Sequence, residues 1–300
     1  MNIEQKDSTL LVAGTIRNGA AGLEISVLRL STALCGFKKL MWLLVESDSS
    51  DETISRLTEL SSRYSDFNFV SLGSLRADFP KRTERLAHAR NVYLEEFQLN
   101  PRYSECNYLM VADLDGVNNL ISREGIDSSW KMGEDAAITA NQSGPYYDIW
   151  ALRHPLWSPN DCWSELEFFK SKYRWPESAL QKSVLSRMIK IDREQSPIEV
   201  LSAFGGMAIY PRNSLYEAKY VGLDPIGREV CEHISISEKI RENGYKIFIN
   251  PKMINTKYTE FSIEKKFSRK TIRILRYPYK VIQNYLKIKT RSSAFGLFGE

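Results

Sequence analysis

The chain has 300 residues, of which 43% are hydrophobic and 26% are charged. This composition is typical of a globular protein with a full core, and it excludes a disordered chain, a collagen-like chain and a disulfide scaffold. The net charge of +4 is unevenly distributed. Residues 264–300 contain ten Lys or Arg and two Glu, so this segment carries +8 and residues 1–263 carry −4.

Cysteine usage and hydropathy limit where the chain can reside. The four cysteines are scattered and show no metal-finger spacing, which favours a reduced intracellular protein. Residues 1–9 are polar and lack the apolar core of a signal peptide. No stretch reaches the ~18 apolar residues of a spanning helix. We therefore expect a cytoplasmic protein, attached to the inner face of a membrane at most peripherally.

The first 112 residues alternate between two kinds of hydrophobic pattern. Short apolar runs predict strands at 10–16, 39–46, 67–72 and 108–112. Amphipathic periodicity predicts helices at 23–34, 51–64 and 80–97. Strands that alternate with helices at this spacing indicate an α/β fold, with a mostly parallel sheet and helices on both faces.

Beyond about residue 140 the pattern changes. Aromatic residues are concentrated in 146–175, which holds four of the six tryptophans. A strand is predicted at 203–210, a helix at 232–243 and a strand at 245–249. With no repeat and no low-complexity linker, we expect one catalytic domain at 1–263, with a first half at 1–120 and a second at 121–263, followed by a tail at 264–300.

Two aspartates follow the fourth predicted strand. In the segment 108–116, an apolar run delivers Asp113 and Asp115, one residue apart, to the carboxyl end of the strand. Open α/β sheets bind ligands at that edge. Carboxylates at positions i and i+2 of an extended chain point to the same side, so both can reach one hard cation such as Mg²⁺ or Mn²⁺.

One enzyme class that places such a pair after a strand is the haloacid-dehalogenase phosphatases. Residues 111–117 match their apolar run followed by Asp-x-Asp-Gly. Their signature lies on the first strand, however, whereas three predicted strands precede it here. These phosphatases also need a late acidic pair, for which the chain offers only Asp224, after Gly222 and Leu223. We keep this interpretation as an alternative.

Three further segments resemble another family in the order in which they occur. The arginine-rich segment 82–91 precedes the aspartate pair, the Phe-Gly-Gly segment 204–210 follows it, and Cys-Glu-His at 231–233 begins the late helix. Together, over roughly residues 10–255, they resemble the GT-A-fold nucleotide-sugar glycosyltransferases, and in particular the Golgi-type α-mannosyltransferases and capsule-associated mannosyltransferases. The resemblance implies a GT-A-like sheet and sugar transfer to a glycan or a lipid-linked glycan in polysaccharide or glycoconjugate synthesis.

The resemblance also implies roles for particular residues. The nucleotide of the donor would contact Thr15, Arg17, Asn18, Glu46, Asp48, Arg85, Arg90 and Asp113, with Arg82 a weaker candidate because it lies nearer the helix start. Mn²⁺ or Mg²⁺ would be held by Asp113, Asp115 and His233. The carboxylate of Glu232 would be catalytic, although either an inverting or a retaining transfer is compatible with the sequence. The acceptor sugar would contact Trp150, His154, Trp157, Gly205 and Gly206.

Each of these assignments has a structural alternative. Asp48 and its neighbour Asp51 are also typical helix-capping residues. Tryptophans and tyrosines of segment 146–175 are more often core residues than a sugar platform. A non-catalytic sugar-binding or membrane-binding protein on a transferase scaffold is therefore a further possibility.

The basic tail requires its own explanation. Between residues 264 and 291, apolar and basic residues alternate as on an amphipathic helix that Pro278 interrupts. Such a segment favours adsorption to an anionic membrane surface, to which each Lys or Arg contributes about 1 kcal/mol. A basic stripe can also bind nucleic acid, but the acidic body and the lack of a recognition motif make nucleic acid an unexpected partner. A helix packed on the domain is the third possibility.

Overall fold

The computed structural model describes residues 4–257, except 131, 134–135 and 174–175. The predicted tail at 264–300, including the segment 264–291 that was expected to contact a membrane, lies outside the described residues. Within the described residues, eight strands form one sheet in the order β3-β2-β1-β4-β7-β5-β8-β6. They are β1 Thr9–Ile16, β2 Lys39–Glu46, β3 Phe67–Ser71, β4 Cys106–Ala112, β5 Ala136–Gln142, β6 Ile198–Val200, β7 Met207–Pro211 and β8 Lys246–Thr256.

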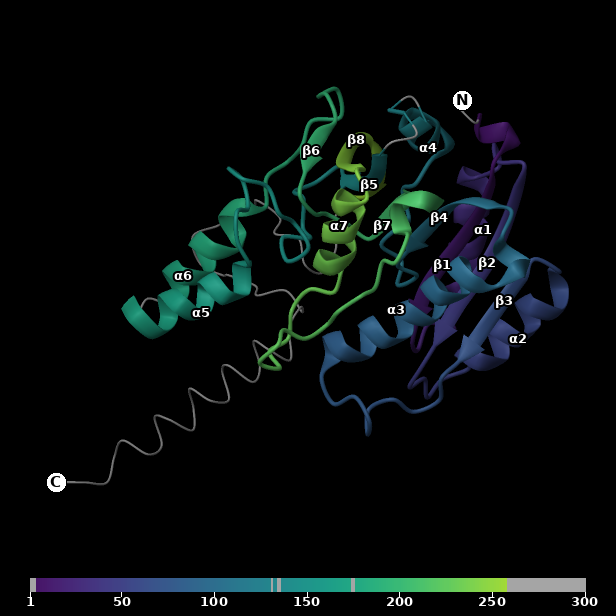
Figure 1. The fold of residues 1–300 in the computed structure, drawn as a ribbon, viewed down its shortest axis with the longest axis horizontal. Helices are drawn as coiled ribbons and strands as arrows, with labels where there is room; N and C mark the ends of the chain where they lie inside the picture. The colour runs from purple at the N-terminus through teal and green to yellow at the C-terminus, as the bar shows by residue number, and fades with distance from the viewer. Residues whose placement is uncertain (1–3, 131, 134–135, 174–175, 258–300) are drawn as a thin grey trace.

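The described residues form seven α-helices, most of which flank the sheet (Figure 1). They are α1 Leu23–Ala33, α2 Thr53–Arg63, α3 Arg82–Leu99, α4 Arg123–Trp130, α5 Cys162–Tyr173, α6 Pro176–Ser183 and α7 His233–Glu242. Helices α5 and α6 pack together at one end of the molecule, away from β1, β2 and β3 (Figure 1). The predicted fold class, a mostly parallel α/β sheet flanked by helices, is confirmed.

Two apolar layers cover the two faces of the sheet. Along β1, Leu11 and Ala13 belong to one layer and Leu10 and Val12 to the other. This alternation is that of a strand buried on both faces. Helices α3 and α7 cover the first face, and α1, α2 and α4 cover the second.

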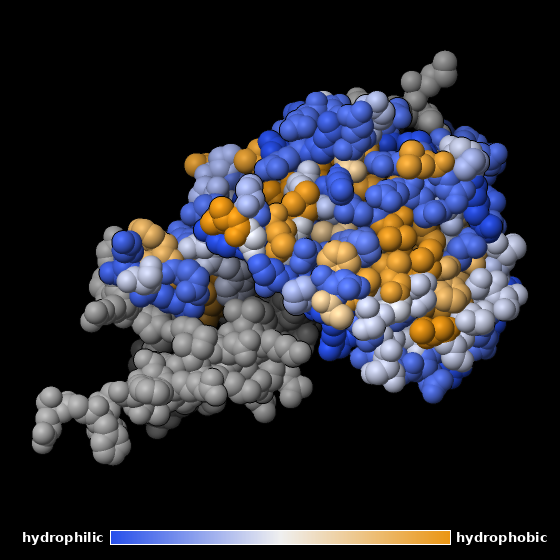
Figure 2. All heavy atoms as spheres, turned by 60° about the horizontal axis from the view of Figure 1, so that its bottom comes forward, coloured by the Kyte–Doolittle hydropathy of each residue, from blue (hydrophilic) through white to orange (hydrophobic). Residues whose placement is uncertain are grey.

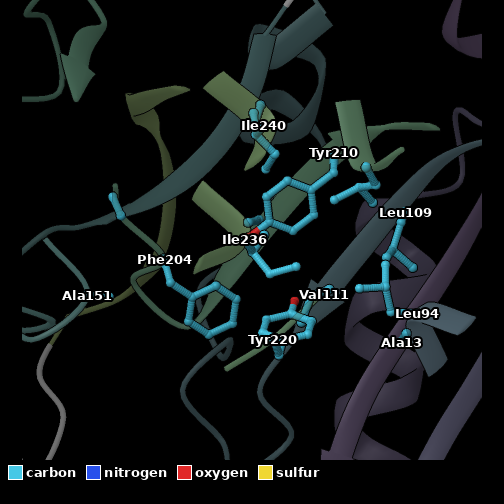
Figure 3. Packing of buried hydrophobic residues seen from close by; sticks show 14 of the residues in the cluster. Ala13, Leu94, Leu109, Val111, Ala151, Phe204, Tyr210, Tyr220, Ile236 and Ile240 are labelled. Carbon is cyan, nitrogen blue, oxygen red and sulfur yellow. The ribbon is translucent and has the colours of Figure 1, made fainter. Parts of the chain in front are cut away.

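Close packing on the first face joins the two halves of the chain. Figure 3 shows Ile236 and Ile240 of α7 against the ring of Tyr210 in β7, with Phe204 and Tyr220 nearby. Tyr210 in turn pairs with Leu109 of β4. The loops that carry the candidate site therefore rest on a single continuous core.

Strand direction departs from the simplest prediction. β7 is antiparallel to both of its neighbours, β4 and β5, and β6 is antiparallel to β8. The remaining neighbours pair in parallel, so the sheet is mixed at its centre and at one edge. β7 follows an irregular segment instead of a crossover helix, which leaves it free to return in the opposite direction.

Several elements of the second half were not predicted. β5, β6, α4, α5 and α6 have no counterpart among the predicted elements, and β8 continues through Asn250 and Pro251, where the sequence suggested that the strand ends. β8 accommodates Pro251 at register shifts in its pairing with β5. Proline is tolerated in a strand at such irregularities.

The described surface is polar on the face shown in Figure 2, where apolar side chains gather in patches surrounded by hydrophilic ones. Across the residues that the structure describes, no helix combines the length and the apolar character needed to cross a bilayer.

Candidate functional site

The order of strands creates a switch point next to β4. From β1 the chain adds β2 and β3 on one side, and then β4 on the other. Ligands of open α/β sheets bind at the carboxyl edge at such a point. The carboxyl ends of the parallel strands β1 and β4 lie there side by side, and a Cβ on Gly14 would come within 2.4 Å of the carbonyl oxygen of Ala112. Asp113 and Asp115 are therefore delivered to the expected ligand edge.

The backbone of Asp113 is held from the second half of the chain. Its N–H donates to the carbonyl of Gly206 at 3.0 Å. The side-chain amide of Asn118 donates both to the carbonyl of Asp113, at 2.7 Å, and to that of Gly206, at 3.1 Å. Asn255 in turn donates to the side-chain oxygen of Asn118 at 2.9 Å. This buried amide network fixes the aspartate loop against the ends of β5 and β8.

Gly205 and Gly206 are required by this arrangement. Their φ angles are +68° and +87°, a conformation that favours glycine. A Cβ on Gly206 would lie 2.4 Å from Val117 Cγ1, and one on Gly205 would lie 2.9 Å from the carbonyl oxygen of Ala140. The pair, predicted as sugar contacts, is placed beside the aspartates, where it orders the loop that carries them.

Arg90 forms the cationic centre of the site. Its Nε donates to Glu232 Oε1 at 3.1 Å, and its terminal nitrogen lies 3.5 Å from Asp113 Oδ1. The guanidinium carbon lies 5.3 Å from the ring centre of Phe204 and 5.8 Å from that of Tyr220. Desolvation opposes the charge, but the neighbouring tyrosine and carboxylates outweigh it and raise the pKa of Arg90 well above its usual value. Arg90 is therefore a permanent cation.

Negative charge accumulates opposite Arg90. Burial raises the pKa of Asp113 to about 7; Arg90 opposes this rise, while Asp115, Asp148 and Glu232 add to it. Asp115 is exposed and accepts a hydrogen bond from the N–H of Val117 at 3.2 Å. Asp148 accepts a hydrogen bond from the N–H of Gly205 at 2.9 Å, and burial raises its pKa. Four carboxylates thus act on one small region.

The expected metal set is only partly assembled. Within the part of the chain that the structure describes, no group of three or more His, Cys, Asp or Glu side chains converges to hold a metal ion. The prediction that Asp113, Asp115 and His233 form one shell is therefore not supported by their positions. The two aspartates alone fit a hard divalent cation, because Mg²⁺ and Mn²⁺ favour oxygen ligands and the surplus negative charge around Asp113 favours a cation.

His233 lies in the core beneath the site. Its ring stacks on Phe204, with centres 3.9 Å apart and planes at 17°, and it meets Tyr220 edge-on. Burial, together with the positive charge of Arg90, lowers the pKa of His233 well below its ordinary value, so the ring is neutral. Its Nδ1 is buried and has no hydrogen-bond partner among the described residues. A neutral, stacked imidazole supports the packing around Arg90 from this position.

Glu232, the predicted catalytic carboxylate, is buried and paired with a cation. Its side chain is 6% exposed and is bonded to Arg90, whose side chain is 5% exposed. A base must reach the hydroxyl from which it takes the proton. In this position Glu232 holds Arg90 in place.

Helix α3 is fixed at its start by residues 220–229. Asn91 pairs with both backbone groups of Tyr220, at 2.9 and 2.8 Å, and Thr83 donates through its hydroxyl to the carbonyl of Gly222 at 2.6 Å. These bonds direct the first turn of α3 toward the aspartates. Arg82 opens the helix, and although its side chain is exposed, partial desolvation lowers its pKa while Glu232 and Asp113 raise it. Arg82 therefore belongs to the same site.

A second group of arginines lies on the side of β1 and β2. Partial desolvation lowers the pKa of Arg17, Arg76 and Arg85 lower it further, and Asp48 opposes them. Arg85 donates to the carbonyls of Phe79 and Pro80, at 2.5 and 2.8 Å. Arg76, Arg85 and Asp48 thus lie near enough to Arg17 for their charges to act on it.

The remaining predicted nucleotide contacts have structural bonds. Asn18 accepts a hydrogen bond from the N–H of Ser50 at 2.7 Å, and Asp48 accepts from the N–H groups of Leu75 and Arg76. Glu46 is buried and accepts from the N–H of Ser49 at 2.9 Å and from the hydroxyl of Ser71. Thr15 is half-buried near the carboxyl end of β1. These residues shape the rim of the edge, and Asn18 and Asp48 adopt positive φ to do so.

The predicted acceptor aromatics are bonded within the protein. The indole N–H of Trp150 donates to Asp161 at 2.9 Å, and that of Trp157 donates to the carbonyl of Arg187 at 2.7 Å. Nδ1 of His154 accepts from the N–H of Leu156 and of Trp157. The side chains of all three are therefore held by hydrogen bonds within the second half of the chain.

The acidic residue that a phosphatase would need lies elsewhere. Asp224 accepts hydrogen bonds from the backbone N–H groups of Ile226 and Arg228 and pairs with the Arg228 guanidinium at 2.6 Å. It closes an exposed turn through these bonds. Asp224, the late acidic residue considered for the phosphatase alternative, is thus engaged within its own turn.

Among known proteins, the chain is similar to several solved structures. No protein-family model matches the sequence, and no curated protein matches it. The mannosyltransferase PcManGT from Pyrobaculum calidifontis, in complex with GDP-Man and Mn²⁺, is 14% identical with a TM-score of 0.45, and the match covers 86% of this chain and 58% of that one. S. aureus TarS 1–349 in complex with UDP-GlcNAc is 12% identical with a TM-score of 0.46, covering 84% and 59%. GalNAc-T7 with UDP, GalNAc and Mn²⁺ is 16% identical with a TM-score of 0.47, covering 85% and 45%.

The chain is similar to GT-A glycosyltransferases. The resemblance to GT-A glycosyltransferases that the sequence predicted is therefore confirmed. The chain spans a little over half the length of the first two structures and less than half of the third. At these identities the likeness concerns overall arrangement, and the chemistry has to follow from the residues of this chain.

Three residues of the site were missed or ranked low from the sequence. Arg82 was placed behind Arg85 because it lies nearer the helix start, yet the bonds of Thr83 and Asn91 aim the first turn at Asp113. Asn118 and Asp148 carry no local pattern. Their roles arise from contacts across 88 and 57 residues, with Gly206 and Gly205 respectively, which no spacing rule can reveal.

Proposed function

We propose that the protein is a metal-dependent glycosyltransferase, which moves a sugar from a nucleotide-sugar donor to a glycan or lipid-linked glycan acceptor. One observation carries this proposal: Asp113 and Asp115 lie at the switch point of the sheet, facing the arginines of α3. Neighbouring carboxylates and arginines at a ligand edge suit a diphosphate bound together with a divalent cation.

In this proposal Asp113 and Asp115 hold Mn²⁺ or Mg²⁺. When bound, such an ion neutralises negative charge that develops on the departing nucleoside diphosphate. Arg82, at the exposed start of α3, donates to the diphosphate oxygens, for which a guanidinium offers paired donors. Arg17 and Arg85 add positive charge on the nucleoside side, and Thr15, Asn18 and Asp48 form the rim there. Glu46 supports that rim from below.

Arg90 and Glu232 act as positioning residues. Arg90 is buried and permanently charged, so it orients the Asp113 carboxylate without moving during the reaction. Glu232 keeps the Arg90 guanidinium in that orientation. A preorganised charge of this kind stabilises the transition state more than a mobile one, because no reorganisation is needed. The acceptor sugar would lie in the half formed by residues 121–263, where it would contact Trp150, His154 and Trp157.

The proposal is tested by nucleotide binding with and without metal. We expect UDP or GDP to raise the melting temperature of the wild-type protein in Mn²⁺ but not in EDTA. Asp115→Asn should weaken this binding at least tenfold, because the variant lacks one of the two carboxylates that hold the metal. The fold should be retained, because the Asp115 side chain is exposed. Asp7→Asn, at an exposed aspartate in the 3-10 turn Gln5–Asp7, is the matched control and should bind like wild type.

Two results decide against the proposal. Metal-independent nucleotide binding that survives Asp115→Asn would contradict the aspartate site. Metal-dependent binding without hydrolysis or transfer of any of several nucleotide sugars would instead favour a non-catalytic sugar-binding protein on the same scaffold.

A further inference from the structure

A half-open cavity with a mixed polar and apolar lining lies beside the aspartate loop. Its volume is about 440 Å³, within the ~300–1,000 Å³ of small-molecule sites. It is lined by Leu120, Ser122, Ser143, Lys190, Arg193 and Lys252, together with Ile191, Asp192 and Ile254. The loop that carries Asp113 and Asp115 continues directly into this wall at Leu120 and Ser122.

Hydrogen bonds connect the cavity wall with the candidate donor site. The N–H of Leu120 donates to the carbonyl of Asn255 at 2.8 Å. The side chain of the same Asn255 bonds to Asn118, which bonds to the carbonyl of Asp113. On the opposite wall, the N–H of Ser143 donates to the carbonyl of Thr256 at 3.0 Å. The cavity is thus held to the aspartates by ordered backbone.

Positive charge dominates the cavity lining. Three of the lining side chains are cationic and one, Asp192, is acidic. The Oδ1 of Asp192 accepts a hydrogen bond from the N–H of Glu194 at 2.9 Å. Lys252 has one long ion pair, at 3.7 Å to an exposed Glu194. Exposed pairs of this kind contribute little energy, so Lys252 can exchange this partner for a ligand.

Lys190 and Arg193 have no ion pair among the residues that the structure describes. Glu124 lies near enough to Arg193 that its pKa is lowered by this charge, after the larger effects of its own backbone N–H and of Ser122. The side chains of Ser122 and Ser143 also line the cavity. Cations without carboxylate partners beside hydroxyl groups are the donor set that an anionic saccharide requires.

We propose that this cavity binds the anionic group, phosphate or carboxylate, of a saccharide acceptor. The inference rests on the proposed function, because the acceptor of a transfer must lie next to the donor. Lys190 and Arg193 contact the anion, and Ser122 and Ser143 contact the hydroxyl groups of the sugar. The acceptor is then a charged glycan, and neutral sugars bind less well.

The test is direct binding of small probes. Saturation-transfer NMR compares glucose 6-phosphate, glucuronate and methyl glucoside, with the full chain in EDTA. We expect the two anionic sugars to bind and methyl glucoside to bind at least tenfold more weakly. The two anionic probes distinguish a phosphate site from a carboxylate site. In the double variant Lys190→Ala/Arg193→Ala, binding of the preferred anion should fall at least tenfold.

The matched control is Arg29→Ala/Lys38→Ala. Arg29 and Lys38 are also exposed cations, and the double variant removes the same charge from residues that do not line the cavity. It should bind the anionic sugar as wild type does. Equal loss in both double variants would mean that net charge alone attracts the anion, and this would overturn the proposal. Unchanged binding after Lys190→Ala/Arg193→Ala would also overturn it.

Two further measurements separate this proposal from other outcomes. Mn²⁺-dependent UDP or GDP stabilisation should be unchanged in Lys190→Ala/Arg193→Ala, so failure of the donor site is read independently of failure of the acceptor site. Binding to phosphatidylglycerol vesicles that depends on Lys190 and Arg193, without binding of the anionic sugars, would identify the cavity as a membrane contact and overturn the assignment.

Discussion

Among single residues, Arg90 balances most of the charge in the site. It is the one cation within 3.5 Å of both Asp113 and Glu232 among the described ion pairs. Burying a charge is tolerable only when it is paired and hydrogen-bonded. Arg90 and its carboxylates are therefore interdependent, and the effect of removing one depends on whether the others are still charged.

Replacing Arg90 should reveal this dependence. We expect Arg90→Met to lower the free energy of unfolding by about 3–5 kcal/mol, because Glu232 is left buried and unpaired. The double variant Arg90→Met/Glu232→Gln should recover part of that loss, and urea denaturation of both single variants and the double measures the coupling. Additive losses in the cycle would show that the two side chains do not interact.

Asp113 makes stability depend on pH in the metal-free protein. Its pKa of about 7 in the folded state lies above the ordinary value of ~3.9. The folded protein thus holds this proton more tightly, so the contribution is fully present below pH ~4 and is lost as the pH rises through about 7.

Asp113→Asn removes that dependence. In EDTA at pH 8 we expect the variant to be about 1–3 kcal/mol more stable than wild type, which is less than the full shift implies because the side chain is 32% exposed. Near pH 4 the two proteins should unfold at similar urea concentrations. A wild-type protein as stable as the variant at pH 8 is incompatible with this account.

Asn118 has a role that differs from that of an ordinary buried amide. Because its side chain bonds to the carbonyls of Asp113 and Gly206, Asn118→Ala should weaken Mn²⁺-dependent nucleotide binding at least tenfold as well as destabilise the fold. Asn250→Ala is the matched control, since Asn250 is also buried and bonds to Ser128 and Ser129. Calorimetric titration at a temperature where both variants are folded should show a loss in Asn118→Ala only.

At the scale of elements, the start of α3 and the segment that follows β7 form one unit. Thr83 and Asn91 bond to residues 220 and 222, and Tyr93 donates to the hydroxyl of Tyr220 at 3.2 Å. This contact, and not the helix alone, sets the direction of Arg82 and Arg90. The arginine-rich segment has its function because the second half of the chain holds it.

Gly222 allows the two elements to touch. A Cβ there would lie 2.1 Å from the carbonyl oxygen of Thr83, a backbone atom that cannot rotate away. We expect Gly222→Ala to destabilise the protein by about 1–3 kcal/mol. The control Gly22→Ala, where a Cβ meets nothing within 4 Å, should change the denaturation midpoint little. Similar midpoints for both variants would show that the segment yields without strain.

At the scale of the whole molecule, the structure determines which thiols react. All four cysteines are free; Cys35 is exposed and the other three are buried. Burial raises the pKa of Cys106 to about 11, and it also raises those of Cys162 and Cys231. Only thiolates attack disulfide reagents, so one fast-reacting thiol is expected in the native protein and four in urea. Two or more fast thiols under native conditions would indicate that a core cysteine is accessible.

The first half of the fold could be predicted from the sequence to within a few residues, whereas in the second half only β7, α7 and the start of β8 could be predicted. β1 to β4 and α1 to α3 alternate regularly. Each of these strands reads as a continuous apolar run, and each of these helices has apolar residues on one face, so the hydrophobic pattern distinguishes them. β6 has three residues and α4 eight, too short to show a period. The direction of β7 depends on pairing with β4 and β5, which are distant in sequence.

The site divides in the same way. Asp113, Asp115 and Arg90 could be found because each lies in a local pattern: an apolar strand end or a helix rich in arginine. Their partners Asn118, Asp148 and Asn255 could not, because hydrogen bonds between strand ends leave no periodic trace. The stacked position of His233 also follows from packing with Phe204, 29 residues earlier, instead of from the motif in which it lies.

The position of β7 between β4 and β5 has a consequence for biosynthesis. β4 is complete at Ala112, but its second neighbour begins only at Met207. At about 5–20 residues per second, the ribosome needs on the order of five to twenty seconds to make the intervening ~95 residues. During that time the apolar edge of β4 has no partner strand and is a template for association with other nascent chains. A trigger-type chaperone that covers this edge until β7 emerges should raise the soluble yield in cell-free synthesis, whereas adding it after release should not.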